Sequence, residues 1–454
     1  MAAKEIEKVF EAPAEALEKA VEVGQSLGKA IQKQESIKEA ENYWKSLGPG
    51  LTTGAADDDP SGIATYSQTG AKYGFGLLWL SLFTFPLMAI VQEMCARIGL
   101  VTGRGLAGNI RLYFPKWVIY VCAILLFLAN SLNIGADLGA MAEATKLVFP
   151  GTSFWFLLFG FTVISILLQV FTTYESYAKY LKYLTFVLLS YIVTAFIVKI
   201  DWSLALRSTV IPNLTIGHDQ LFLICAILGT TISPYLFFWQ TSQEVEEEIL
   251  EGKTNLQERQ VTDYSDVKKM RIDVWSGMFV SNLVMFFIIA ASAATLNAAG
   301  IGNINTASDA AAALKPLAGQ FASTVFAIGI IGTGMLAVPV LAGSASYAIS
   351  ESFGWKIGLY KKLKQAYAFY GVIIVATIVG MAINFLGIDP IKALIYSAVA
   401  NGLVAPVVLV FILLISSNKK VMGEWVNSKL VMVLGWLIFG IMVASGAAAI
   451  YSLI

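Results

Sequence analysis

Residues 55–66 read AADDDPSGIATY and lie inside an apolar segment that runs from about Leu51 to Tyr66. Three consecutive carboxylates, followed by Pro60, Ser61 and Gly62, stand where a membrane helix should be most uniform. Proline cannot donate to the helical hydrogen-bond ladder and clashes with the preceding turn, so we expect the helix to break here. Carboxylates within a membrane are costly and are functional by default. The stretch predicts a broken membrane helix that carries a binding site.

The composition of the whole chain is that of a polytopic membrane protein. Of its 454 residues, 57% are hydrophobic and 14% charged, and the mean hydropathy is +0.70. A soluble domain carries about 25% charged residues. Basic and acidic residues balance at 31 each, which does not suggest a nucleic-acid partner. The single histidine, His218, almost excludes histidine-based metal sites and proton relays, and the three cysteines show no metal-binding spacing.

Windows of about 20 apolar residues predict eleven membrane spans. Their approximate limits are 49–70, 75–98, 117–147, 152–172, 180–200, 217–241, 273–297, 320–349, 367–387, 391–416 and 430–452. Residues 1–46 are rich in Ala, Glu and Lys without a signal-peptide pattern, and are expected to form a cytoplasmic amphipathic tail. We expect a transporter core over residues 47–416 and an additional span within 417–454.

The distribution of Lys and Arg predicts the orientation of these spans. One set of alternate loops holds eighteen basic residues, and the other set holds six. Because basic loops stay in the cytoplasm, the N-terminus is expected inside and the C-terminus outside. The protein is expected to be an integral protein of the plasma membrane.

The sixth span has its own interruption, Gly229-Thr230-Thr231-Ile232-Ser233-Pro234-Tyr235. Each break lies in the first span of a five-span block, spans 1–5 and 6–10. Paired interruptions in corresponding halves point to a transporter built from inverted repeats, with its substrate at the breaks. A structural kink is the alternative at either proline alone. The carboxylates beside the first break favour a cationic substrate.

Four segments resemble the Nramp family of divalent metal transporters. They are GPGLTTGAADDDPSGIATYSQTGAKYGFGLLW (48–79), ARIGLVTGRGLA (96–107), NIGADLGAMA (133–142) and TTISPYLFFWQTS (230–242). The resemblance covers nearly all of residues 48–416 in span order. It implies an all-α membrane protein of eleven helices with the LeuT-type fold, that is, two inverted five-helix repeats with broken helices 1 and 6.

The binding motifs depart from the usual family pattern. Asp59 matches the family's aspartate ligand, whereas Gly62 replaces its asparagine ligand. Thr230 takes the place of an alanine whose carbonyl binds metal, and Ser233 replaces a methionine. A thioether favours transition metals and oxygen ligands suit Mg²⁺, so the pattern resembles the Nramp-related magnesium transporter branch. A partly hydrated Mg²⁺, with Mn²⁺ as a second cargo, is the implied substrate.

The resemblance also bears on proton coupling. The family's histidine in span 6 is Tyr235 here, its aspartate in span 3 is Asp137, and its following glutamate is Ala140. Span 367–387 has no Arg or Lys where the family has an arginine. Uncoupled, facilitated flux is therefore expected, with Asp137 and Tyr235 as remnants of a proton path.

Further candidates keep two interpretations each. Asp57 and Asp58 could each attract cations or hold outer-shell water, or they could bond free amides of the broken helix. Asn401 could contact a metal-bound water or form a helix–helix hydrogen bond. Glu93 is expected to pair with Arg97, and the acidic run QEVEEEILEGK (243–253) to be a solvated helical face.

Two other transporter types remain open at this point. One is a proton-coupled Mn²⁺/Fe²⁺ symporter, and the other is a sodium-coupled organic-solute transporter of the same fold. Neither an enzymatic activity nor a resident cofactor is expected. The expected partners are the divalent ion and the lipid bilayer, and no oligomer is implied.

Overall fold

The computed structural model describes residues 48–172, 189–214 and 217–452, except for the side chains of residues 317–318. The predicted tail, residues 1–46, lies outside this part of the chain, as do residues 180–188 of the predicted fifth span. The regular elements of the described part are all helical. The principal helices are α3 (Pro49–Asp57), α4 (Pro60–Tyr73), α5 (Trp79–Thr102), α6 (Leu106–Tyr113), α7 (Lys116–Val148), α8 (Phe154–Phe171), α10 (Leu189–Ile197), α11 (Trp202–Val210), α12 (His218–Thr231), α13 (Pro234–Leu250), α14 (Leu256–Arg259), α15 (Tyr264–Ser292), α16 (Ala307–Ala311), α17 (Lys315–Ala318), α18 (Ala322–Phe353), α19 (Tyr367–Ile383), α20 (Pro390–Ser416), α21 (Lys419–Met422) and α22 (Lys429–Ser452).

The helices agree closely with the predicted spans. Nine helical segments of the described part are long and apolar enough to cross a membrane, and α12 with α13 forms one of them. The predicted first span is divided into α3 and α4. The described portion of the predicted fifth span contains α10. The eleven-span prediction is consistent with this arrangement.

Both predicted helix breaks are present, and each has a local cause. Pro60 and Pro234 occupy the first positions of α4 and α13, where a proline ring preorganises the helix and needs no hydrogen-bond acceptor. The residues just before them, Asp59 and Ser233, have extended backbones. Each predicted span is therefore two helices joined by a short non-helical link.

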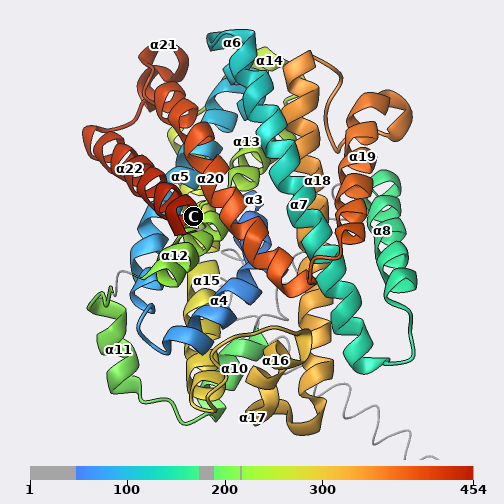
Figure 1. Cartoon of the computed structure of the whole chain (residues 1–454). Helices are drawn as coiled ribbons and strands as arrows, with labels where there is room; N and C mark the ends of the chain where they lie inside the picture. The colour runs from blue at the N-terminus through green and yellow to red at the C-terminus, as the bar shows by residue number, and fades with distance from the viewer. Residues whose placement is uncertain (1–47, 173–188, 215–216, 453–454) are drawn as a thin grey trace, which may run out of the picture. The chain divides into compact units, whose positions relative to one another are not determined.

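The helix α3 lies at the centre of the bundle, beside α15 (Figure 1). Glycines allow this close approach, because a Cβ atom on Gly54 would lie 2.3 Å from the carbonyl oxygen of Gly277. At the start of α3, the backbone amides of Gly50 and Leu51 donate to the Asp273 carboxylate at 2.6 and 3.3 Å. This carboxylate satisfies amides that a helix start leaves without partners.

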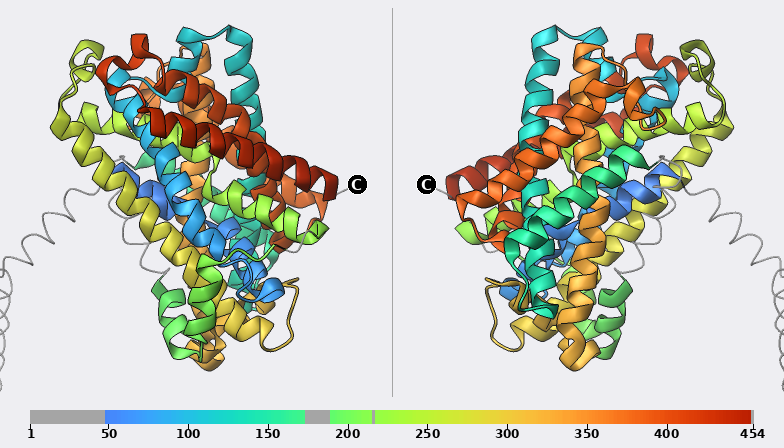
Figure 2. Two further views of the ribbon diagram at one scale, coloured as in Figure 1. Left: turned by 90° about the vertical axis from the view of Figure 1, so that its left-hand side faces the viewer. Right: turned by 90° about the vertical axis from the view of Figure 1, so that its right-hand side faces the viewer.

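A second group of helices surrounds the breaks from the other side. The long helix α7 packs against α18, α19 and α20, and α20 also packs against α12 and α4. The short helices α6, α14 and α21 lie at one end of the bundle, with α11, α16 and α17 at the other end (Figures 1 and 2). We call the first the basic-loop end, because Arg104, Arg111 and Arg259 lie there.

The prediction that residues 243–253 form a solvated face is wrong. The helix α13 continues to Leu250, and Glu244, Glu246 and Glu248 are buried. Each carboxylate has a partner that lowers the cost of burial. Gln240 donates to Glu244 at 2.8 Å, Tyr347 donates to Glu246 at 2.5 Å, and Lys253 pairs with Glu248 at 3.2 Å.

The predicted pairing of Glu93 with Arg97 is confirmed at 3.4 Å. Glu93 also accepts hydrogen bonds from two residues of α15, Arg271 at 3.0 Å and Trp275 at 2.7 Å. The side chain therefore joins α5 to α15 in addition to stabilising its own helix.

Candidate functional site

The two helix breaks lie against each other. The Tyr235 hydroxyl, one residue into α13, donates to the carbonyl oxygen of Ala56 near the end of α3 at 2.9 Å. Gly62, in the first turn of α4, faces the end of α12, because a Cβ atom added to it would lie 3.2 Å from Thr230 Oγ1. The structure thus brings together Asp59, Gly62, Thr230 and Tyr235, which come from both halves of the chain.

Asp59 is the N-cap residue of α4. Its Oδ1 accepts hydrogen bonds from the Ser61 hydroxyl at 2.6 Å and from the Gly62 amide at 2.7 Å. Side-chain caps of this kind stabilise a helix start by about 1 kcal/mol. Within the described residues, its Oδ2 accepts one hydrogen bond, from Asn133 Nδ2 of α7 at 2.8 Å. The two oxygens of this buried carboxylate thus have different partners.

The neighbouring carboxylates, Asp57 and Asp58, are equally buried but less well satisfied. One oxygen of Asp57 accepts from the Ser281 hydroxyl of α15 at 2.7 Å, and the other has no partner within the described residues. Neither oxygen of Asp58 has a hydrogen-bond partner there. In this structure Asp59 bonds the free amide of Gly62, so the amide-capping interpretation of Asp57 and Asp58 is wrong.

Asn133 and Ser397 belong to this network, although the sequence did not indicate them as site residues. Ser397 Oγ of α20 lies 2.5 Å from Asn133 Oδ1 and 2.8 Å from the carbonyl oxygen of Leu394. Both side chains are fully buried. Helical spacing could have found Asn133, since it lies four residues before Asp137 and therefore on the same face of α7.

Asp137 is the fourth buried carboxylate of the site. Both of its oxygens lack a hydrogen-bond partner in the described part of the chain, and it lies within electrostatic range of Asp59. An unpaired carboxylate at this depth is stabilised either by a nearby positive charge or by uptake of a proton.

Ser233 and Asn401 complete the set of predicted residues. The Ser233 hydroxyl lies 2.6 Å from the Gly229 carbonyl oxygen and 2.7 Å from that of Thr230. It thus satisfies the carbonyl end of α12, much as Asp59 satisfies the amide end of α4. Asn401 is buried in α20, and its amide has no hydrogen-bond partner among the described residues. The interpretation of Asn401 as a helix–helix hydrogen-bonding residue is therefore wrong for the described part of the chain, and its contact with a metal-bound water stays a prediction.

The available donors at the two breaks are oxygens. Residues 57–62 and 229–235 contain no His, Cys or Met. Within the described residues, no three His, Cys, Asp or Glu side chains converge as a metal-binding group. A cation here would have one or two carboxylates, with hydroxyl and carbonyl oxygens and retained water as its other ligands. The carbonyl ends of α3 and α12 carry partial negative charge, which also favours a cation.

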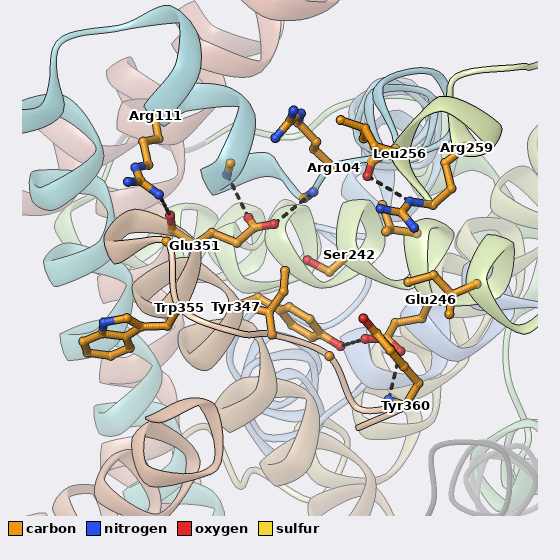
Figure 3. A pocket seen from close by; sticks show the side chains of 18 of the residues that line it. Arg104, Arg111, Ser242, Glu246, Leu256, Arg259, Tyr347, Glu351, Trp355 and Tyr360 are labelled. Atoms are coloured by element: carbon orange, nitrogen blue, oxygen red, sulfur yellow. Dashed lines mark hydrogen bonds between the residues drawn. The ribbon is translucent and has the colours of Figure 1, made fainter. Parts of the chain in front are cut away.

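A cavity of about 570 Å³ opens at the basic-loop end, lined by residues of α6, α13, α18 and their loops (Figure 3). Glu351 of α18 accepts hydrogen bonds from the amides of Gly105 and Gly108 at 3.0 and 2.8 Å. Glu246 accepts from the amides of Leu359 and Tyr360 at 2.9 and 3.1 Å. These buried carboxylates hold the loops around the cavity.

A smaller cavity of about 210 Å³ lies at the opposite end. Lys72 of α4 and Asp219 of α12 form an ion pair there at 2.6 Å. The Gln68 side chain donates to the Gly302 carbonyl oxygen at 3.1 Å and accepts from the Ile304 amide at 2.8 Å. Asp59 lines neither of these two cavities.

Comparisons with known proteins agree with this geometry. The family described as "Natural resistance-associated macrophage protein-like", Nramp, matches residues 50–452. The chain is 30% identical to a divalent metal cation transporter, MntH, of Yersinia pestis over 418 residues, covering 90% of this chain and 95% of that protein. It is 25% identical to MntH of Deinococcus radiodurans over 420 residues, with 90% of both chains covered.

Solved structures give the same fold. A manganese transporter of Eremococcus coleocola superposes with a TM-score of 0.70 at 19% identity, covering 90% of this chain and 88% of that one. An inward-facing structure of Mhp1 superposes with a TM-score of 0.52 at 12% identity, covering 89% and 90%. The LeuT-type fold predicted from the sequence is confirmed.

Proposed function

Because the chain belongs to the Nramp family, we propose that it is a carrier for Mg²⁺, with Mn²⁺ as a second cargo, and that it works without a coupled proton. The chain is an integral membrane transport protein for divalent metal cations and not an enzyme. The curated relatives are divalent metal cation transporters, and the superposed Eremococcus protein is a manganese transporter.

The set of oxygen donors at the two breaks supports a hard cation as cargo. Mg²⁺ is usually held by one or two carboxylates and keeps several waters, whereas thioether and imidazole ligands favour transition metals. Asp58 and Asp59 supply the carboxylates, and Thr230 and the carbonyl end of α12 supply further oxygen atoms. Ser233 presents a hydroxyl where the family pattern has a thioether. The unpartnered Asp58 carboxylate is the observation that carries this proposal.

The residues at the positions where the family pattern has proton-carrying side chains support uncoupled flux. An imidazole exchanges protons near neutral pH, but this place is occupied by Tyr235, whose hydroxyl donates to the Ala56 carbonyl oxygen. The helix α19 contains no Lys, Arg or His. A gradient and a membrane potential suffice as driving forces, because a divalent ion gains about 4.6 kcal/mol per 100 mV, twice the value for one charge.

The orientation and the domain limits form part of the same proposal. The N-terminus lies in the cytoplasm, the basic-loop end faces the cytoplasm, and the C-terminus lies outside. Residues 47–416 form the transporter core, preceded by the tail 1–46 and followed by the additional span within 417–454. Basic loops at one end of the bundle support this orientation.

Flux into proteoliposomes tests the cargo and the site. Mg²⁺ uptake by the wild-type protein should increase with an imposed inside-negative membrane potential. Asp59→Ala should reduce the flux to the level of vesicles without protein. Glu251→Gln is a suitable control, because Glu251 is exposed at the end of α13. Equal Mg²⁺ flux through wild-type protein and Asp59→Ala would refute the site assignment.

A pH-sensitive dye inside the same vesicles tests coupling. Uncoupled transport predicts a constant internal pH during Mg²⁺ or Mn²⁺ uptake. Acidification in step with Mn²⁺ uptake would favour the proton-coupled Mn²⁺/Fe²⁺ symporter, for which the retained Asp137 is the supporting residue. Sodium-dependent uptake of an organic solute, with no divalent flux, would favour the third type of transporter.

A further inference from the structure

Asn133 is placed to respond directly to an ion on Asp59. Its amide lies between two partners, with Nδ2 donating to Asp59 Oδ2 at 2.8 Å and Oδ1 accepting from Ser397 at 2.5 Å. All three residues are nine-tenths or more buried, so no solvent competes for these bonds. Oδ2 is the Asp59 oxygen that is not engaged in capping α4.

A cation bound to Asp59 Oδ2 would meet the two hydrogens of the Asn133 amide group. An amide nitrogen is only a donor, so its contact with a cation is repulsive. The amide must therefore move away or turn when the ion binds.

A half-turn of the amide keeps the hydrogen bonding intact. Nδ2 would then donate to Ser397 Oγ, which can accept because a hydroxyl has two lone pairs as well as one hydrogen. The Ser397 hydrogen already has a second acceptor, the Leu394 carbonyl oxygen at 2.8 Å. Asn133 Nδ2 and the Ser397 hydroxyl then each retain an acceptor, and Asn133 Oδ1 faces the ion.

We propose that the Asn133 amide oxygen is a ligand of the transported ion, reached by this half-turn and supplied by α7. The inference rests on the proposed function, since it requires a divalent cation on Asp59. Gly62 has no side chain with which to bind an ion, and the Asn133 amide compensates for this from a different helix. In the ion-free state the same amide offsets the charge of Asp59 through a hydrogen bond.

Replacement of the amide by a thiol tests direct contact. In Asn133→Cys, a soft ligand would reach the ion, so Cd²⁺ should bind at least about tenfold more tightly than to wild-type protein, and Mg²⁺ about tenfold more weakly. Binding is measured by isothermal titration of the purified full chain in detergent, independently of transport. Ser397→Cys is the matched control, because its thiol would lie behind the amide and should bring no gain in Cd²⁺ affinity.

The proposal would be overturned if Asn133→Cys did not gain Cd²⁺ affinity. It would also be overturned if Asn133→Cys and Ser397→Cys gained equally. If Asn133→Cys does not fold, Asn133→Asp and Asn133→Leu decide the question. A ligand role predicts that Asp at this position retains Mg²⁺ binding and that Leu loses it. Equal loss in both variants would assign Asn133 to packing alone. Wild-type protein that binds no divalent cation would instead refute the proposed function, which separates the two failures.

Discussion

Glu246 provides the most direct test of the unexpected burial of the acidic run at the end of α13. Its carboxylate receives three hydrogen bonds, from the Tyr347 hydroxyl and from the backbone amides of Leu359 and Tyr360. Figure 3 shows Glu246 beside Tyr347 and Tyr360. These bonds fix the loop after α18 to the second half of the broken helix. We therefore expect substitutions of Glu246 to lower the stability of the folded protein.

The expected magnitudes follow from the donors that each substitution leaves without a partner. In Glu246→Gln, the amide oxygen can still accept from Tyr347 and Leu359, but the new NH₂ group faces the Tyr360 amide. One buried donor without an acceptor costs about 1–3 kcal/mol. In Glu246→Ala, all three donors lose the carboxylate. Truncation to Ala opens space in which water can reach these donors, so we assign the net value of about 1 kcal/mol to each bond, or about 3 kcal/mol in total.

Thermal unfolding in detergent, followed by tryptophan fluorescence, measures the effect. Both Glu246 variants should unfold at lower temperature than wild-type protein. Glu251→Gln is the matched control on the same helix end, since its exposed pair with Lys269 at 3.3 Å contributes less than about 1 kcal/mol. The reasoning would be refuted by an unchanged midpoint in Glu246→Ala, or by an equal decrease in the control.

Three further predictions concern the site and its supporting packing. Asp58→Asn should weaken Mg²⁺ binding in titration while raising the thermal midpoint, because it removes a buried charge that has no partner among the described residues. A lower midpoint with unchanged binding would contradict this. Ser233→Met should raise the ratio of Cd²⁺ to Mg²⁺ affinity about tenfold, or about 1.4 kcal/mol, since a thioether is a soft ligand; an unchanged ratio would exclude Ser233 from the site. Gly277→Ala should abolish transport or folding, because its Cβ would lie 2.1 Å from the Gly50 carbonyl oxygen, whereas Gly440→Ala has open space around the added methyl and should resemble wild-type protein in both flux and midpoint.

The fold could be predicted from the sequence because its main signals are local. Apolar windows locate membrane spans, and Pro60 and Pro234 locate the breaks without reference to any neighbour. The resemblance in four short motifs then supplied the order of the repeats. The structure supports these predictions wherever it describes the chain, and it adds the lateral packing that the spans require.

The site could be predicted only in part, because its remaining contacts join residues far apart in the chain. Asn133 and Ser397 meet only after α7 and α20 pack together, and no spacing in the sequence shows this. The burial of Glu246 depends likewise on Tyr347 and on a loop more than a hundred residues away. A run of glutamates is ordinarily exposed to solvent, so its sequence alone predicts exposure. Its burial here depends on hydrogen bonds to residues that are distant in the chain.

The structure divides two tasks between the two oxygens of Asp59. Oδ1 satisfies the first amides of α4, and it can continue to do so whether or not an ion is present. Among the described residues, Asn133 is the single hydrogen-bond partner of Oδ2, and this is the bond that the proposed ion would replace. If the carboxylate had to give up its hydrogen bonds to the start of α4 in order to bind an ion, the helix would lose about 1 kcal/mol of stability in each transport cycle. On the proposed site, where Oδ2 is the oxygen that binds the ion, capping and binding use separate oxygens, so ion entry and release would leave the start of α4 intact.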